Sequence, residues 1–416
     1  MRIFFILVTT VIISQGSLFA QRACVTSVYL QQEQARFPQI GQQIERIESF
    51  IDQRMQLASA GRLQGGQSVI KIPVVVHILY HQPKENIPDS RVHAQILALN
   101  ESFRRRAADT VNTPAIFRSV AADCEIEFVL ATSDPVFRAT NGIVRKYTPI
   151  TQWEMDDQMK FEASLGSNAW DPSGYLNIWV CNIKGVAGYS TWPGSEAAKD
   201  GIVINYKYFG PNTMPGYEMG KTAVHEAGHW LGLKHIWGDE NCGNDFVHDT
   251  PKQSFYNIGC PTGTRVSCGN GPKGDMYMNY MDFTDDRCTN LFTEGQKARM
   301  HTLFEPGGPR HSLLSSTGLD EPLNQEMPLP EEAPRWLYSH LYPNPATSEI
   351  TLDISHDVRW LGKSLTVTNT NGQQLMQVII NNRIQQIDIS RLRAGIYFLS
   401  GKKEDGQIIR FKFVKM

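Results

Sequence analysis

The chain has 416 residues, which is enough for two or three domains and a large core. Its 40 basic and 42 acidic residues give a formal net charge of −2. This balance gives no reason to expect a nucleic acid or an anionic membrane surface as a partner.

The first 20 residues have the pattern of a secretory signal peptide. Arg2 is followed by an apolar run over residues 3–13, and small residues lead to a predicted cleavage point after Ala20. The run is short for a membrane span and no later segment is apolar enough, so we expect a secreted or cell-surface protein without a transmembrane segment in its mature form. The alternative is an uncleaved anchor.

Residues 21–61 have a helical pattern in which Ile44, Ile47 and Ile51 recur at helical spacing. A stretch containing Gly and Ser follows over residues 59–66 and is typical of an accessible link. We therefore predict a propeptide over residues 21–61. The alternative is a simple N-terminal extension of the main domain.

The main domain is predicted over residues 62–305, where apolar runs alternate with helical patterns and indicate a mixed sheet with helices packed on it. Residues 236–290 are rich in Gly, Pro, Asn and Asp and predict irregular structure. The predicted strands cover residues 72–80, 125–131, 176–183 and 201–208, with a short edge strand within residues 188–194. The predicted helices cover residues 90–103, 218–231 and 293–304, the last with a capping box of Thr293 and Gln296.

Residues 225–235 read HEAGHWLGLKH and have the pattern of a metal site. On a helix, His225 and His229 lie one turn apart on the same face, so both imidazoles can reach one ion. Gly232 lets the chain turn sharply, so that His235 arrives from another direction as a third ligand. Three neutral nitrogens leave a fourth position open, which is the pattern of a catalytic rather than a structural zinc.

Glu226 lies beside the two helical histidines, where it reaches a water molecule rather than the metal. The expected chemistry is hydrolysis, in which zinc acidifies a water and polarises a carbonyl while Glu226 carries the proton to the leaving amine. The alternative is that the three histidines are ordinary packed or surface residues.

This segment resembles the long zinc motif of the metzincins. Residues 279–283 (NYMDF) resemble their Met-turn, which implies that Met281 packs beneath the three imidazoles. Residues 280–300, together with GYSTWPG and LNIWVCNI, resemble the pappalysin family in its cytophagalysin- and ulilysin-like branch. The resemblance covers about residues 70–305. It implies an α+β metzincin-like catalytic domain, with a mixed five-stranded sheet and helices above the cleft and an irregular, disulfide-bearing lower subdomain.

The resemblance also implies structural calcium in the lower subdomain. Asp245, Asp249 and Thr250 fall in the matching loop, and Asp245 and Thr250 are the expected ligands. A carboxylate with nearby main-chain oxygens suits calcium. The alternative is a solvated acidic loop in which an aspartate caps a turn.

The chain has seven cysteines, so at least one is unpaired in an oxidising environment. Four of them lie close together in the irregular region, and the sequence alone allows three pairings among them. Cys124 and Cys181 lie on or beside predicted strands, as a bonded pair or as buried thiols. The resemblance implies the disulfides Cys242–Cys268 and Cys260–Cys288.

Cys24 lies alone in the predicted propeptide and is the best candidate for the unpaired cysteine. Residues 22–24 (RAC) resemble the cysteine-switch segment of related zymogens, which implies that the Cys24 thiolate occupies the open position on zinc. Val25 stands where that pattern usually has Gly. The alternative is attachment of a lipid, of glutathione or of a second chain at Cys24.

The cytophagalysin-like relatives favour a basic residue just after the scissile bond, which implies cleavage before Arg or Lys. Asp249 and Asp275 are acidic residues in the segment that should line that pocket. Arg62 lies in the predicted link, so the enzyme is expected to process itself before Arg62. Phe283 stands where many pappalysin-type enzymes have a Tyr after the Met-turn methionine, so this position lacks a hydroxyl.

Residues 306–335 have the Pro-, Ser- and Glu-rich composition of a linker, and residues 336–416 have the alternation of an all-β sandwich. Asn-Gly at 371–372 and Asp-Gly at 405–406 indicate hairpin turns. The YPNP motif at 342–345 and the terminal strands resemble the type IX secretion sorting domain, which implies that the type IX secretion machinery is a partner. The alternative is a carbohydrate-binding or stabilising module.

Together these features predict a secreted zinc-dependent endopeptidase, made as a zymogen, that acts on protein or peptide substrates and is monomeric. The rival interpretation is a non-catalytic secreted adhesin or binding protein that retains the fold. The complete set of His225, Glu226, His229 and His235 favours the enzyme, because a binding protein is free to lose Glu226.

Overall fold

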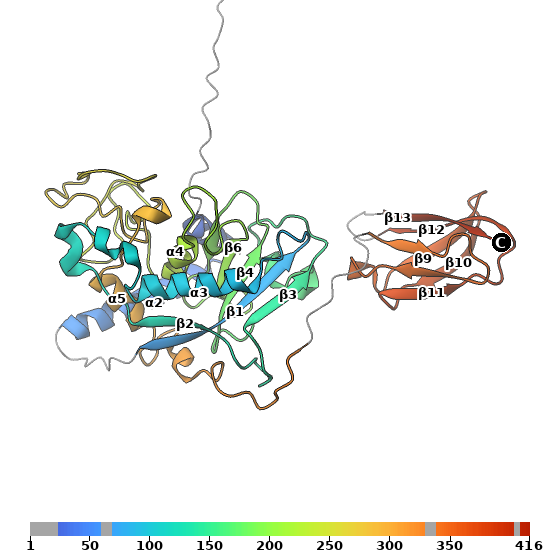
Figure 1. Cartoon of the computed structure of the whole chain (residues 1–416), viewed down its shortest axis with the longest axis horizontal. Helices are drawn as coiled ribbons and strands as arrows, with labels where there is room; N and C mark the ends of the chain where they lie inside the picture. The colour runs from blue at the N-terminus through green and yellow to red at the C-terminus, as the bar shows by residue number, and fades with distance from the viewer. Residues whose placement is uncertain (1–23, 60–68, 329–337, 403–407) are drawn as a thin grey trace, which may run out of the picture.

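The computed structural model describes residues 24–59, 69–328, 338–402 and 408–416. The predicted signal peptide, the link that contains Arg62 and the Asp-Gly turn at 405–406 lie outside these residues. The N-terminal and central part of the chain forms an α/β body, and the C-terminal part forms an all-β body (Figure 1).

The α/β body is built on one mixed sheet with the strand order β2-β1-β4-β6-β5. All neighbouring pairs on this path are parallel except β5 with β6, which is antiparallel and forms one edge. Long apolar runs explain the central strands, which are buried on both faces. The strands are β1 (Ile70–Tyr80), β2 (Ile126–Leu130), β3 (Ile143–Tyr147), β4 (Leu176–Cys181), β5 (Gly188–Ser190) and β6 (Ile202–Asn205).

The sheet has six strands among the described residues, whereas the sequence predicted five. The additional strand is β3, which pairs with the second half of β1 while β2 pairs with the first half. The two short strands therefore follow one another along the same edge of β1, and the sheet keeps five lateral positions. Strand β3 was missed because Arg145 and Lys146 interrupt its apolar pattern and most of it is only half-buried.

Three helices of this body are close to their predicted bounds: α3 (Asp89–Phe103), α4 (Lys221–Trp230) and α5 (Glu294–Thr302). Helix α4 begins three residues later than predicted, because Gly220 adopts a left-handed conformation with φ 72° just before it. Thr293 and Gln296 form the predicted capping box at the start of α5.

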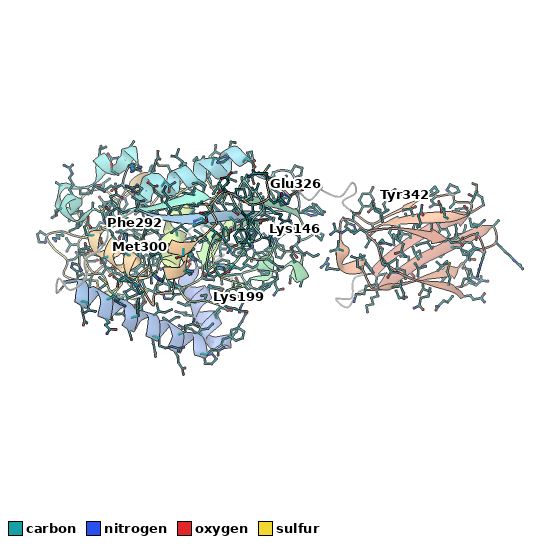
Figure 2. All side chains as sticks on the ribbon, turned by 90° about the horizontal axis from the view of Figure 1, so that it is seen from below. Lys146, Lys199, Phe292, Met300, Glu326 and Tyr342 are labelled. Atoms are coloured by element: carbon teal, nitrogen blue, oxygen red, sulfur yellow. A yellow bond between two sulfur atoms is a disulfide. The ribbon has the colours of Figure 1, made fainter. Side chains whose placement is uncertain are left out.

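The N-terminal segment forms two helices, α1 (Thr26–Arg36) and α2 (Gln39–Ser59). They lie along one side of the α/β body, with Lys199 beside them (Figure 2). Ile51 of α2 is fully buried in the main core, and Ile47 packs against the same core. The predicted helical spacing therefore buries one face of α2 against the rest of the body.

Residues 236–290 are irregular apart from the short 3-10 helix η5 (Asp286–Cys288). The structure forms the disulfides Cys242–Cys268 and Cys260–Cys288, which are the pairs that the resemblance implied. Cys124 and Cys181 are buried free thiols, and Cys24 is also free. Further 3-10 helices in this body are η1 (Ala108–Asn112), η2 (Ala115–Val120), η3 (Gln158–Lys160), η4 (Glu162–Ser164) and η6 (His311–Ser315).

The predicted linker at 306–335 begins too early. Leu313 is buried in the main core, and the buried guanidinium of Arg310 forms an ion pair with the buried carboxylate of Asp200. The amide of Ala139 donates to the carbonyl of Asn324 at 2.7 Å. The Pro- and Ser-rich composition concealed these contacts, so the compact body extends to at least residue 324.

The C-terminal body consists of two antiparallel sheets around one apolar core, with the strand orders β10-β9-β12-β13 and β11-β8-β7. The predicted Asn-Gly turn at 371–372 joins β9 to β10. The elements are β7 (His340–Tyr342), β8 (Glu349–Asp353), η7 (Val358–Trp360), β9 (Ser364–Asn369), β10 (Gln374–Ile379), β11 (Ile384–Asp388), β12 (Gly395–Lys402) and β13 (Ile408–Lys415). In the described part of the chain, none of the helices is long and apolar enough to cross a membrane.

Candidate active site

Helix α4 and the turn after it bring the three motif histidines together. His225 and His229 project from the same face of α4, and every residue of this helix is buried. Gly232 has φ 78°, a conformation that favours glycine, and the amide of Leu233 donates back to the carbonyl of Gly228 at 2.9 Å. This turn directs His235 toward the other two rings, as its position in the sequence predicted.

In each of these histidines, Nδ1 contacts an oxygen atom and Nε2 is the nitrogen that can bind a metal ion. Nδ1 of His225 donates to the carbonyl of Tyr280 at 2.6 Å, and Nδ1 of His229 donates to the carbonyl of Leu233 at 2.8 Å. Nδ1 of His235 contacts the carboxylate of Asp239 at 2.5 Å. Since a neutral imidazole carries one proton, a proton on each Nδ1 leaves a lone pair on each Nε2.

The three Nε2 atoms face one another. Nε2 of His229 lies 3.1 Å from that of His225 and 3.0 Å from that of His235. Burial, and then the neighbouring His235, lower the pKa of His229 to about 3, so this ring is neutral. Three converging lone pairs repel one another unless a cation lies between them, so the residues fit a zinc ion.

Met281 lies beneath this group. Its sulfur is so close to Gly228, between the two helical histidines, that a Cβ at Gly228 would approach it to 2.4 Å. The turn is held by the side-chain oxygen of Asn279, which accepts from the amide of Met281 at 2.9 Å. The predicted Met-turn position is therefore a buried support for α4.

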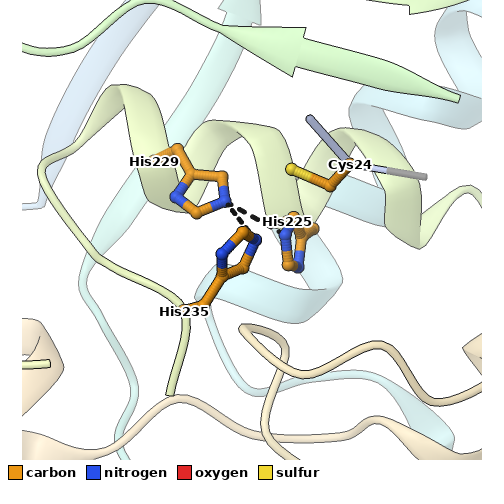
Figure 3. Close-up of side chains that lie close together, drawn as sticks. All are labelled: Cys24, His225, His229 and His235. Atoms are coloured by element: carbon orange, nitrogen blue, oxygen red, sulfur yellow. Dashed lines mark hydrogen bonds between the residues drawn. The ribbon is translucent and has the colours of Figure 1, made fainter. Parts of the chain in front are cut away.

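Cys24 completes a four-residue group with the histidines. Its sulfur and one nitrogen of each of His225, His229 and His235 all lie within 4.8 Å of one another. Figure 3 shows the four side chains together. Among the described residues, this is the group of His, Cys, Asp and Glu side chains with the spacing of a shared metal site. Cys24 also forms a parallel bridge with Gly188 of the edge strand β5.

Glu226 is fully buried beside β5 and contacts the N-terminal segment. Its Oε2 accepts a hydrogen bond from the Thr26 hydroxyl at 2.9 Å. The same hydroxyl accepts from the amide of Ser190 at 3.0 Å. Thr26 therefore connects the predicted catalytic carboxylate to the edge strand, a role that the sequence analysis missed because Thr26 belongs to no motif.

An aromatic cluster lines the side of the site near His235. The ring of Trp237 stacks on His235 with centroids 4.3 Å apart, and Phe283 lies edge-on to His235 at 4.9 Å. Tyr256 packs on Phe283 at 5.1 Å. Phe283, at the position that carries Tyr in many relatives, is thus part of an apolar wall here.

The predicted calcium residues are brought together only in part. The Thr250 hydroxyl donates to the Asp245 carboxylate, with oxygen distances of 2.8 and 3.0 Å, and burial raises the pKa of Asp245 to about 6. Asp249 lies elsewhere, where it accepts from the Thr293 hydroxyl at 2.7 Å and from the amide of Gly295 at 2.9 Å at the start of α5. A buried carboxylate with a raised pKa fits a cation, which would stabilise its charged form.

Asp275, the other acidic residue considered for the specificity pocket, accepts from the Ser267 hydroxyl at 2.5 Å and from the Asn270 amide at 2.7 Å. The structure therefore uses Asp249 and Asp275 in local hydrogen bonds.

Comparison with known proteins shows the family of this chain. The family model Peptidase_M43, described as Pregnancy-associated plasma protein-A, matches residues 160–305. The model of the Secretion system C-terminal sorting domain matches residues 340–415. An extracellular metalloprotease of Pyricularia oryzae is 31% identical over 263 residues, which cover 59% of this chain and 79% of that protein.

Two solved structures are also similar. A promirolysin mutant of Tannerella forsythia is 41% identical with a TM-score of 0.64, over 70% of this chain and 96% of that chain. Mature mirolysin of the same organism, in complex with a cleaved peptide, is 45% identical with a TM-score of 0.58, over 60% of this chain and 96% of that chain.

The chain therefore belongs to the Peptidase_M43 family of metalloproteases. It is a secreted zinc metalloendopeptidase that is made as a zymogen and carries a C-terminal secretion sorting domain. This confirms the family, the fold class and the enzymatic function that the sequence predicted.

Proposed function

We propose that His225, His229 and His235 hold the zinc ion and that Glu226 is the catalytic base. The observation that carries this proposal is the convergence of three Nε2 atoms whose Nδ1 partners fix the rings. When bound, zinc supplies a Lewis acid that polarises the scissile carbonyl and acidifies a water. Glu226 takes the proton of the attacking water and delivers it to the leaving amine.

The test is Glu226→Gln, compared with the wild-type enzyme at equal metal content. We expect kcat to fall by about 10²- to 10⁴-fold while one zinc per chain is retained, because the ligands are unchanged. Metal removal by a chelator should abolish casein cleavage, and added zinc should restore it. Full activity of Glu226→Gln, or of the metal-free protein, would refute these assignments. An inactive zinc-loaded wild-type protein would instead support the binding-protein interpretation.

We also propose that residues 21–61 act as the prosegment and that the Cys24 thiolate is the fourth ligand in the zymogen. The position of Cys24 against the three histidines supports this assignment. The bridge between Cys24 and Gly188 and the hydrogen bond from Thr26 to Glu226 occupy the edge strand and the catalytic base at the same time. Substrate cannot use this edge until the segment leaves.

For maturation we propose cleavage before Arg or Lys, including self-processing at Gly61–Arg62. This proposal rests on the resemblance to enzymes that favour a basic residue after the scissile bond, while Asp249 and Asp275 accept hydrogen bonds from neighbouring groups. A peptide library and N-terminal sequencing test it. An aliphatic preference after the scissile bond would refute the specificity. Normal maturation of isolated Glu226→Ala would refute self-processing.

For the lower subdomain we propose a calcium site at Asp245 and Thr250, supported by the buried carboxylate and its contact with the threonine hydroxyl. Calcium should raise the melting temperature of the wild-type zymogen but not that of Asp245→Asn. Equal responses of the two proteins would refute the site.

We further propose that the enzyme is monomeric and that the type IX machinery recognises residues 336–416. Light scattering tests the first point, and deletion of those residues, which should block export, tests the second.

A further inference from the structure

Behind the edge strand β5 lies a buried polar site that is filled by a side chain of the N-terminal segment. The hydroxyl of Tyr29, on helix α1, donates to Oδ2 of Asp157 at 2.8 Å. Tyr29 is 5% exposed and Asp157 is 1% exposed. The Tyr29 ring packs on Tyr189 of β5 with a centroid distance of 4.8 Å.

The other groups around Asp157 leave its Oδ2 facing the tyrosine. The Tyr189 hydroxyl donates to Oδ1 at 2.8 Å, and Nζ of Lys160 lies 2.8 Å from the same Oδ1. Lys160 is fully buried and also donates to the carbonyl of Lys199 at 2.7 Å. Asp157 and Lys160 together carry no net charge, and Oδ2 of Asp157 is the acceptor for the tyrosine hydroxyl. We call this neutral site, formed by Asp157, Lys160 and Tyr189, the Tyr29 seat.

This seat lies on the opposite face of β5 from the catalytic carboxylate. Gly188 faces Glu226, since a Cβ at Gly188 would approach its Cγ to 3.2 Å. Side chains alternate along a strand, and Tyr189 accordingly packs with Trp179 and Val203 in a separate cluster. The N-terminal segment therefore crosses the edge strand, with Thr26 at Glu226 on one side and Tyr29 in the seat on the other.

Removal of the segment would open the seat to solvent. A cavity of about 390 Å³ already lies between the N-terminal helices and the loop that carries Trp192 and Lys199, and Tyr29 forms part of its wall. Without α1 and α2, this cavity and the space left by Tyr29 become one continuous groove beside β5.

The groove is within reach of a bound substrate. Tyr29 follows Thr26 by one helical turn, which is about 5 Å along the axis. An extended peptide advances roughly 3.3 Å per residue, so a side chain about one or two residues from the scissile bond covers the same distance.

We propose that the Tyr29 seat is a substrate-binding subsite of the mature enzyme, formed by Asp157, Tyr189 and Lys160, which accepts a tyrosine side chain of a protein substrate. The inference rests on the proposed removal of the prosegment and adds a second specificity element to the same active site. Tyr29 acts in the zymogen as the internal occupant of this subsite.

The chemistry of the seat selects among aromatic and basic residues. Phenylalanine fits the same space but leaves the buried Oδ2 of Asp157 without its donor, and sites built to bind a hydroxyl reject such analogues. Arginine or lysine would bring a second cation toward buried Lys160. The subsite therefore differs in kind from one that selects a basic residue after the scissile bond.

The experiment measures kcat/KM of the activated, zinc-loaded enzyme on a series of quenched peptides. One residue is varied at a time, at the first or second position to either side of the scissile bond, among Tyr, Phe, 4-methylphenylalanine, Leu and Arg. At one of these positions we expect Tyr to exceed Phe and 4-methylphenylalanine by about tenfold or more, with Arg no better than Phe. The methyl derivative matches the size of Tyr without its donor, so it separates hydrogen bonding from shape.

Asp157→Asn provides the matched enzyme variant. The Tyr-to-Phe ratio should fall toward one, because the variant loses the carboxylate that accepts from the tyrosine hydroxyl. If Asp157→Asn fails to fold because Lys160 loses its partner, the peptide series on the wild-type enzyme decides alone. Ratios within twofold at every position would overturn the subsite while leaving the protease intact. If neither peptides nor casein were cleaved, the proposed function would fail and the subsite with it.

Discussion

The two N-terminal helices hold the α/β body by different means. Helix α1 places polar side chains on groups of the site: Thr26 on Glu226, Tyr29 on Asp157 and Glu33 on Lys199. Helix α2 instead buries Ile51 in the main core and contacts α5 through the ion pair of Glu48 with Arg299. Helix α1 therefore occupies the active site, whereas α2 attaches the segment some distance along the chain from it.

The two helices therefore have different roles: α1 blocks the active site, and α2 anchors the N-terminal segment to the body. Cys24, just before α1, and Thr26 and Tyr29 of α1 each occupy a group that the mature enzyme uses, namely the zinc ligand position, the catalytic carboxylate and the proposed subsite. The α2 contacts touch no catalytic group directly, although Arg299 also donates to the carbonyl of Gly232 at 2.7 Å, in the turn before His235. Loss of the Cys24, Thr26 or Tyr29 contacts should therefore affect latency strongly, and changes in α2 should affect how readily the segment is released.

The largest effect is expected for Cys24→Ala. Loss of the thiolate opens the fourth position on the metal, so we expect zymogen activity on a quenched peptide to rise by about two orders of magnitude or more. Val28→Ala, at an exposed position of α1 four residues after Cys24, is the control and should stay latent. A Cys24→Ala zymogen as latent as the wild type would show that Cys24 does not hold the zinc.

Acidic pH should destabilise the part of the fold that packs near α1. Burial lowers the pKa of His77 to about 4, against an ordinary value of 6.5, and its ring stacks on Trp179, which also faces Lys160. Because the unfolded chain binds the proton first, the stability that neutral His77 contributes is complete above pH 6.5. It is lost as the pH falls toward 4, by about 3 kcal/mol. Denaturant titrations of the wild type and His77→Gln at pH 7.5 and 4.5 test this, since the variant should lack that part of the pH dependence.

Local sequence patterns predicted most of the fold and of the metal site. The strand runs, the capping box of Thr293 and the spacing of His225, His229 and His235 all depend on neighbours within a few residues. The contacts of Thr26 with Glu226 and of Tyr29 with Asp157 join residues 200 and 128 positions apart. Single polar residues at such separations have no periodicity, so the sequence alone does not reveal their partners.

The same reasoning explains the two structural corrections. Strand β3 has charged residues on a half-buried edge, so its pairing with β1 depends on a neighbour and not on its own pattern. The segment after α5 reads as a linker because few of its residues are apolar, yet Arg310 enters the core to meet Asp200 and stacks on Trp230 at 3.8 Å.

An intermediate effect is expected for Thr26→Val, which keeps the shape of the side chain but removes the hydroxyl. Glu226 then loses a donor and the amide of Ser190 loses an acceptor. A hydrogen bond to a charged group is worth about 1.5–3 kcal/mol, so zymogen activity should rise by about tenfold or somewhat more while Cys24 still holds the metal. Thr26→Ser retains the hydroxyl and should behave like the wild type. Equal latency of Thr26→Val and Thr26→Ser would show that the contact with Glu226 is incidental.

The smallest effect is expected in α2, for Glu48→Gln. Both carboxylate oxygens of Glu48 accept from Nη2 of Arg299, at 2.6 and 2.7 Å, and the Arg299 side chain is fully buried. The amide still offers one acceptor, and the Glu48 side chain is 18% exposed, so water compensates in part. We expect the zymogen to mature about three- to fivefold faster without a rise in its initial activity, because the Cys24 and Thr26 contacts are unchanged.

Glu45→Gln, an exposed carboxylate three residues earlier on the same helix, makes the same change in charge and should mature at the wild-type rate. Quantifying the mature band over time, with a parallel peptide assay of the unprocessed protein, distinguishes the two steps. A burst of activity before processing would place α2 among the blocking contacts. Identical rates for Glu48→Gln and Glu45→Gln would show that apolar burial around Ile51, and not the ion pair with Arg299, holds α2 in place.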